Sequence, residues 1–137
     1  MGFANPGTVT VGPYTTASDM AQTEGQGAFL SGAMGSEVVT GEDDDASIAL
    51  VGAVVSVQGE YSASGNQQTA VVAVNGEAWG IAGAAFALGA QLTINASGKW
   101  ITATSGTLVF ARSLQAASAA DDLVKINCMG NAGAVLT

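Results

Sequence analysis

The stretch that decides the fold reads T-A-V-V-A-V-N-G-E-A-W-G-I, at residues 69–81. Residues 69–74 are rich in β-branched and small apolar side chains, a composition typical of a β-strand. Asn75-Gly76 is the strongest short turn signal in the chain, because both residues tolerate a positive φ. Residues 77–81 supply a partner strand, so the sequence predicts a β-hairpin that turns at Asn75-Gly76.

The segments before and after this stretch also predict short strands. Residues 47–58, S-I-A-L-V-G-A-V-V-S-V-Q, form a continuous apolar run that predicts a strand buried on both faces, with a bulge or bend at Gly52. Residues 60–68 are polar and predict a loop. Three further strands are expected downstream, joined by turns at Ser97-Gly98 and Ser105-Gly106. Their ranges are 91–95, 99–104 and 107–111.

The last expected strand covers residues 123–128, L-V-K-I-N-C. Alternation places Val124, Ile126 and Cys128 on a buried face and leaves Lys125 and Asn127 on a wet one. Helices are disfavoured across residues 78–92, because each glycine there costs ~1 kcal/mol against alanine in a helix interior. One or two helical turns are expected over residues 113–120. The sequence therefore predicts an all-β fold.

The low charge content and acidic balance of the chain exclude several classes of partner. The chain has 137 residues, of which 48% are hydrophobic and 10% charged, with 11 acids against 3 bases and a net charge of -8. We expect no nucleic-acid partner and no membrane partner, since both need clustered Lys and Arg or a long apolar segment. Residues 1–13 lack the basic and apolar regions of a signal peptide.

The sequence predicts two regions. Residues 1–45 are expected to form an extended N-terminal arm with loops, and residues 46–137 a β-rich body.

Catalytic and metal-binding chemistry finds little support in the sequence. Histidine is absent and Cys128 is the only cysteine, which removes Ser-His-Asp and Cys-His catalysis and multi-thiolate metal sites. Cys128 is expected to be buried and inert. We therefore expect no enzyme, no metal and no cofactor.

Two groups of acids have alternative interpretations. The run Glu42-Asp43-Asp44-Asp45 predicts a solvated loop. A divalent-cation site is the alternative, although adjacent carboxylates cannot all point at one ion. Asp121-Asp122 predicts a turn before the last strand. Paired acid–base carboxylates are the alternative, which the opposite directions of neighbouring strand residues disfavour.

Aromatic and apolar residues supply the candidates for an interface. Aromatic side chains on an otherwise unpacked arm should dock on a partner or on the body. The two tryptophans are expected in strands, either in the core or as interface anchors. The candidate contact residues are Phe3, Pro6, Thr8, Val9, Val11, Tyr14, Trp79 and Trp100.

An ordered series of short motifs follows residue 75: a Gly/Ala-rich segment, a strand, two turns, an Ala-rich stretch and a closing apolar strand. The motifs are Gly83-Ala84-Ala85, Leu88-Gly89-Ala90, Ala96-Ser97-Gly98-Lys99, Ser105-Gly106, Ala111, Leu114, Ala116-Ala117-Ser118 and residues 123–126. In this order they resemble the capsid decoration (cement) proteins of tailed bacteriophages. The likeness covers roughly residues 69–128.

The resemblance implies a small Gly/Ala-rich β-barrel or β-tulip-like body with a structural role. Such a protein binds the outside of the expanded phage capsid and stabilises contacts between major capsid subunits. Its partners would be the major capsid protein and further copies of itself, as a homotrimer or alternatively a dimer. It would be assembled in the bacterial cytoplasm and end on the capsid surface of the virion. The alternative function is a virion-surface or tail-associated β-domain that binds a receptor or a carbohydrate.

Overall fold

The structure is a computed structural model that describes residues 8–16, 19–31, 37–40, 50–62, 65, 68–106, 108–129 and 134–135. These residues contain eleven strands and no helix. The strands are β1 (Val9–Thr16), β2 (Gly27–Ser31), β3 (Glu37–Thr40), β4 (Leu50–Gln58), β5 (Thr69–Ile81), β6 (Gln91–Ile94), β7 (Trp100–Thr102), β8 (Leu108–Val109), β9 (Ala111–Ser113), β10 (Leu123–Met129) and β11 (Ala134–Val135). The all-β, barrel-like prediction is confirmed.

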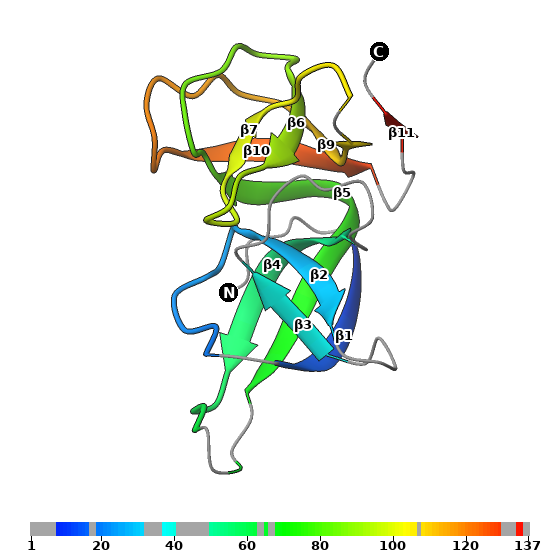
Figure 1. The fold of residues 1–137 in the computed structure, drawn as a ribbon, viewed down its shortest axis with the longest axis vertical. Coiled ribbons are helices and arrows are strands. Elements are labelled where there is room, and N and C mark those ends of the chain that lie inside the picture. The colour runs from blue at the N-terminus through cyan, green and yellow to red at the C-terminus, as the bar shows by residue number, and fades with distance from the viewer. Residues whose placement is uncertain are drawn as a thin grey trace.

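The first four strands and the first half of β5 form a closed ring, which we call the N-terminal barrel (Figure 1). Hydrogen bonding runs in the order β1-β3-β2-β4-β5, and β1 also pairs with β5, which closes the ring. The β1–β3 pair is parallel, whereas the other pairs are antiparallel. The prediction of a bulge or bend near Gly52 is confirmed, because the β2–β4 pairing skips one residue between Gly52 and Leu50.

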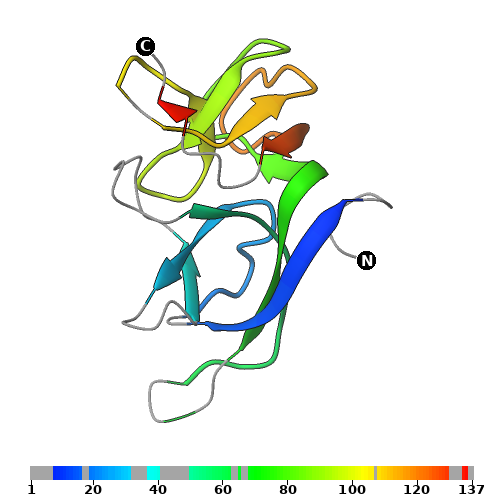
Figure 2. The same cartoon turned by 90° about the vertical axis from the view of Figure 1, so that its right-hand side faces the viewer.

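The second half of β5 continues into a second group of strands, which we call the C-terminal sheet. Its order is β5-β10-β9-β6-β7. An isolated parallel bridge between Ala82 and Trp100 brings β7 back beside the end of β5. β5 therefore passes from the N-terminal barrel into the C-terminal sheet, as Figures 1 and 2 show from two sides.

The predicted hairpin at Asn75-Gly76 is wrong, because both residues lie inside the uninterrupted strand β5. Asn75 pairs with Val9 of β1 and with Met129 of β10, so the two partner strands meet at this point. Gly76 has a φ of 97°, and a Cβ atom there would lie 3.3 Å from the Cα of Thr8. Position 76 therefore favours glycine because β1 passes close to it, and not because the chain reverses there.

The N-terminal third also differs from the prediction of an arm with loops. Within residues 8–40, the strands β1, β2 and β3 supply three of the five strands of the N-terminal barrel. The apolar residues of this third are sparse but not unpacked, since Met20 and Ala28 are completely buried. The three strands mix apolar with polar residues, so the low periodicity of this third did not indicate strands.

Two hydrophobic clusters share β4 and β5. Val54, Ala70 and Val72 belong to the cluster of the N-terminal barrel together with Met20 and Ala28. The intervening residues of the same strands point the other way and join the cluster beneath the C-terminal sheet. That cluster contains Ala53, Val55, Ala73, Ala78, Ala82, Phe86, Leu92, Ile94, Trp100, Leu108, Phe110, Ala111, Ala117, Val124, Ile126 and Cys128. The prediction that residues 47–58 are buried on both faces is confirmed for residues 52–55.

The expected helical turns over residues 113–120 are absent. Ser113 ends β9, and Ala117 forms an isolated antiparallel bridge with Phe86. The hydroxyl of Ser113 donates to the carbonyl of Ala87 over 2.7 Å and accepts the backbone N–H of Ala90. These contacts hold the segment in an extended path against residues 86–90, which overrides the helix propensity of its alanines.

Candidate interaction surface

The candidate contact residues that the structure describes lie in different environments. Phe3 and Pro6 lie outside the described residues. Val9 on β1 is 54% exposed, and the hydroxyl of neighbouring Thr8 donates to the carbonyl of Glu77 over 2.5 Å. Val11 and Tyr14 are half-buried and pack against the cluster of the N-terminal barrel. These residues of β1 therefore belong largely to the fold, with Val9 as their exposed member.

Trp100 is a core residue and its assignment as a contact candidate is corrected. Its exposed fraction is 0%, and its indole N–H donates to the carbonyl of Gly25 over 2.9 Å. Gly25 lies between β1 and β2, so this bond fastens the N-terminal barrel to the C-terminal sheet. The backbone N–H of Ile81 donates to the same carbonyl over 3.0 Å. A partner protein cannot reach Trp100 without opening this junction.

Trp79 lies on the outside of the C-terminal sheet and is half-buried. It pairs across the strands with Lys125 of β10, whose Nζ lies 5.6 Å from the centre of the indole ring. This is a cation–π contact. Trp79 remains a candidate for an interface, now with a cationic neighbour.

The outward side chains around Trp79 form one surface, which we call the outer face. Directly paired residues share a face of a sheet. One row therefore crosses four strands, from Glu77 through Asn127 and Arg112 to Gln91. Trp79 and Lys125 form the next row. The outer face comprises Glu77, Trp79, Ile81, Gln91, Arg112, Leu123, Lys125, Asn127 and Met129, and all of them are exposed or half-buried.

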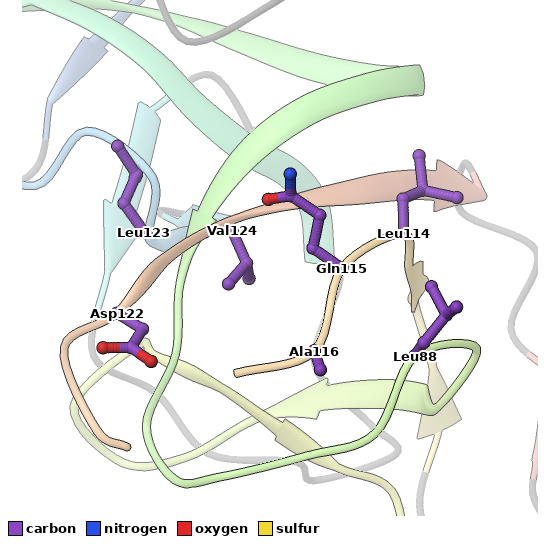
Figure 3. A pocket seen from close by; sticks show the side chains of 7 residues that line it. All are labelled: Leu88, Leu114, Gln115, Ala116, Asp122, Leu123 and Val124. Carbon is purple, nitrogen blue, oxygen red and sulfur yellow. The ribbon is translucent and has the colours of Figure 1, made fainter. Parts of the chain in front are cut away.

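A groove with both apolar and polar side chains in its lining adjoins the Leu123 end of the outer face. It has a volume of about 590 Å³ and is lined by Leu88, Leu114, Gln115, Ala116, Asp122, Leu123 and Val124. Leu88 and Leu114 lie on one side of it and Asp122 and Leu123 on the other (Figure 3). Leu88 is 68% exposed and Leu123 46%. The groove thus brings together two of the three large hydrophobic side chains that are exposed among the described residues.

Hydrogen bonds make one wall of the groove rigid. A carboxylate oxygen of Asp122 accepts from the hydroxyl and the backbone N–H of Ser118, at 2.9 and 2.8 Å, and from the N–H of Ala119 at 3.1 Å. These bonds, led by the Ser118 hydroxyl, hold the pKa of Asp122 below its ordinary value. Asp121, with a φ of 70°, instead forms an ion pair with Lys99. The two acids have different partners in a turn before β10, as predicted.

The remaining sequence candidates contribute no further site. Cys128 is buried in the core, and burial raises the pKa of its thiol to about 11, which confirms that it is a buried residue. The run from Glu42 to Asp45 lies outside the described residues. Among the residues that the structure does describe, no group of three or more His, Cys, Asp or Glu is placed to hold a metal ion. No helix in this part of the chain is long and apolar enough to cross a membrane.

Leu88, Arg112 and Leu123 were not among the sequence candidates, although the structure places them on this surface. Leu123 was accessible to sequence reasoning, because alternation puts it on the same wet face as Lys125 and Asn127. A single apolar residue on a wet face is common, and the place of Leu123 in one groove with Leu88 and Leu114 is what marks it as part of a candidate contact surface. Leu88 lies in a Gly/Ala-rich loop without periodicity, and no sequence signal marks it.

Comparison with known proteins adds no relative. No family model, no curated protein and no solved structure matches the chain.

Proposed function

We propose that this chain is a head decoration (cement) protein of a tailed bacteriophage. It binds the outside of the expanded capsid and stabilises contacts between major capsid subunits, and it carries out no reaction. Further copies of the chain, as a homotrimer, are its second partner, and the capsid surface of the virion is its final location. The role is structural, so it needs neither a metal nor a cofactor.

The observation that supports the proposal most is where the groove and its exposed leucines lie. The two leucines that are exposed among the described residues, Leu88 and Leu123, belong to the segment that resembles decoration proteins. That segment begins with β5, and its part from the second half of β5 through β10 forms the C-terminal sheet. The resemblance and the exposed apolar surface therefore coincide in one half of the molecule.

The energetics favour apolar docking over charge attraction. Burying a leucine completely contributes about 1.5–3 kcal/mol. Leu88 and Leu123 are 68% and 46% exposed, so docking them contributes about 2–3 kcal/mol per copy. A net charge of -8 per chain makes neighbouring copies repel, over a screening length of about 8 Å at physiological salt. Contacts of each copy with two or more capsid subunits would add to the modest affinity of one groove.

Binding to shells tests the proposal. Purified protein should co-sediment with expanded capsid shells and not with free major capsid subunits. Leu88→Ser and Leu123→Ser should each weaken binding about threefold to tenfold, since each substitution removes about 1 kcal/mol of apolar burial. Val9→Ser is the matched comparison, because Val9 is the third large hydrophobic residue that the described part of the chain exposes, and it lies on β1. Loss of binding in Val9→Ser alone would move the contact to the N-terminal barrel, and no binding by the wild type would refute the proposal.

The outer face also favours a second function, the binding of a receptor or a carbohydrate. Trp79 has amide and carboxylate neighbours there, Asn127 and Glu77, and aromatic rings flanked by a few polar groups are common in ligand sites. Binding of soluble sugars or host surface glycans that changes Trp79 fluorescence, without any binding to shells, would favour this function over decoration.

A further inference from the structure

The groove beside the outer face is an opening in the sheet between β10 and the chain that follows β9. The two strands pair as far as Ile126 and Ser113. One further bond runs from the backbone N–H of Leu114 to the carbonyl of Lys125, over 2.9 Å. The N–H of Lys125 then donates over 3.0 Å to the side-chain oxygen of Gln115 and not to a backbone carbonyl. The backbone ladder therefore stops where the groove begins.

The interrupted ladder leaves two backbone carbonyls directed at the groove. In an antiparallel pair, successive residues of a strand direct their hydrogen-bonding groups to opposite sides. The carbonyl of Asp122 accepts from Ala82 on the β5 side, so the carbonyl of Leu123 is directed to the groove side. The carbonyl of Leu114 would accept the N–H of Lys125 in a regular ladder, and that N–H is used elsewhere. Neither the Leu114 nor the Leu123 carbonyl accepts a hydrogen bond from another described residue.

A fixed negative charge lies beside these carbonyls. Asp122 lines the groove, and its Oδ2 holds Ser118 and Ala119 through three hydrogen bonds. These bonds keep the carboxylate in one position, while within the described part of the chain its Oδ1 has no hydrogen-bond donor. The neighbouring acid, Asp121, instead forms an ion pair with Lys99. Asp122 therefore has a carboxylate oxygen available to a partner.

The other side of the groove is apolar. Leu88 and Leu114 lie across it from Asp122 and Leu123 (Figure 3), and Leu88 is 68% exposed. A side chain that fits this groove combines an aliphatic part with a positive charge and several hydrogen-bond donors. Arginine has this combination, because its methylene stem packs on apolar surface while its planar guanidinium presents five N–H donors.

We propose that the groove binds an arginine side chain of a protein partner, with the guanidinium bonded to the Asp122 carboxylate and to the carbonyls of Leu114 and Leu123. Apolar burial against the leucines supplies most of the affinity for the whole partner, and the charge pairing supplies specificity. Lysine fits less well, since its ammonium is compact and strongly hydrated. The assignment goes beyond the proposed function, because it holds for any protein that brings an arginine to the groove.

Nuclear magnetic resonance titration of the full chain tests the assignment without capsid shells, so it can fail while the decoration function stands. The probe is N-acetyl-arginine methylamide, a single blocked residue. It should bind with a millimolar dissociation constant, shift the amide signals of Leu114 and Leu123 saturably, and bind more weakly as salt rises. The uncharged citrulline analogue should bind at least about fivefold more weakly, since charge-assisted hydrogen bonds are roughly twice as strong as neutral ones. The lysine analogue should also bind more weakly than arginine.

Matched variants test the role of Asp122. Asp122→Asn removes the charge and keeps an oxygen for the three hydrogen bonds of the wall, and melting curves check that the fold is retained. It should lower arginine affinity at least about fivefold. Asp121→Asn removes the same charge one residue away and should change the affinity by less than about twofold. Lys125, whose ammonium contacts the ring of Trp79, is a like charge near the groove, so Lys125→Gln should raise arginine affinity slightly.

Several results would overturn the proposal. Equal affinities for the arginine and citrulline probes would show that charge plays no part, and a lysine probe that binds more tightly than arginine would remove the assignment to arginine. Equal losses in Asp122→Asn and Asp121→Asn would indicate non-specific attraction to an acidic chain. Shifts confined to another site, such as the hollow lined by Asp19 and Glu60, or no saturable shifts at tens of millimolar probe, would also overturn it.

Discussion

Replacing Trp100 by phenylalanine tests the junction between the N-terminal barrel and the C-terminal sheet. The indole N–H of Trp100 donates to the carbonyl of Gly25 over 2.9 Å, and the exposed fraction of Trp100 is 0%. Phenylalanine removes this hydrogen bond, at a net cost of about 0.5–1.5 kcal/mol. The carbonyl is not orphaned, because the N–H of Ile81 still donates to it. The cost therefore stays below that of an unsatisfied buried group.

The smaller volume of phenylalanine adds to the loss of stability in Trp100→Phe. Truncating a buried tryptophan to alanine typically costs about 3–5 kcal/mol, and phenylalanine retains most of the ring contacts. We expect Trp100→Phe to lower the free energy of unfolding by about 2–3 kcal/mol in total. Total stabilities of domains are about 5–15 kcal/mol, so the variant should fold but unfold at clearly lower urea concentration.

Trp79→Phe is the matched control for this prediction. Trp79 is half-buried on the outer face and contacts Lys125, so its replacement should cost under about 1 kcal/mol. Urea unfolding followed by circular dichroism gives both values without relying on tryptophan fluorescence. Acrylamide should quench Trp79 in Trp100→Phe and spare Trp100 in Trp79→Phe. Equal losses of stability in the two variants would refute the reasoning, because they would show that Trp100 does not join the two halves.

Three further predictions concern packing, strand closure and pH. Gly52→Ala should prevent folding, since its Cβ would lie 1.9 Å from the carbonyl oxygen of Ala73. Gly89 has a φ of 82° and open space around its Cβ position. Thermal melts should therefore show that Gly89→Ala lowers the free energy of unfolding by only about 1–2 kcal/mol. Deleting residues 1–14 should abolish cooperative melting, because it removes most of β1 and opens the ring; a folded deletion mutant would revive the arm interpretation. The pKa of Asp122 is lowered below its ordinary value of 3.8, so its hydrogen-bonded carboxylate should stabilise the fold above that pH and lose this effect as pH falls through the lower folded value. The stability difference from Asp122→Asn, measured by urea unfolding, should shrink accordingly in acid, and a difference that grows in acid would contradict this.

Strand positions in the second half of the chain could be predicted because local pattern and burial agree there. Residues 123–128 alternate, and the structure buries Val124, Ile126 and Cys128 as expected. The turn at Ser97-Gly98 is confirmed, with Gly98 at a φ of 78° and the Asn95 side chain accepting from two backbone N–H groups. Each of these features depends on residues close together in the sequence, so the sequence alone contains the necessary information.

Features that depend on distant segments could not be predicted. At Asn75-Gly76, β1 pairs with β5, and the paired residues Val9 and Asn75 are 66 positions apart in the sequence. The separation of Arg112 from Lys125 along the chain likewise hides their proximity, which comes from the β9–β10 pairing. Trp100 and Trp79 look alike in sequence, since both occur in short strands. Only the partners of those strands decide that one is buried and the other lies on the outer face.

A protein with the cement function that we propose strengthens the capsid shell, and calorimetry of the shells measures that strengthening. Expanded shells lacking the protein should be melted before and after saturation with it. Bound protein should raise the temperature of shell disruption, with the shift reaching a plateau at a fixed number of copies per capsid subunit, and Leu88→Ser should reduce the shift at subsaturating concentration. Shells that bind the protein fully and melt at an unchanged temperature would contradict the claim.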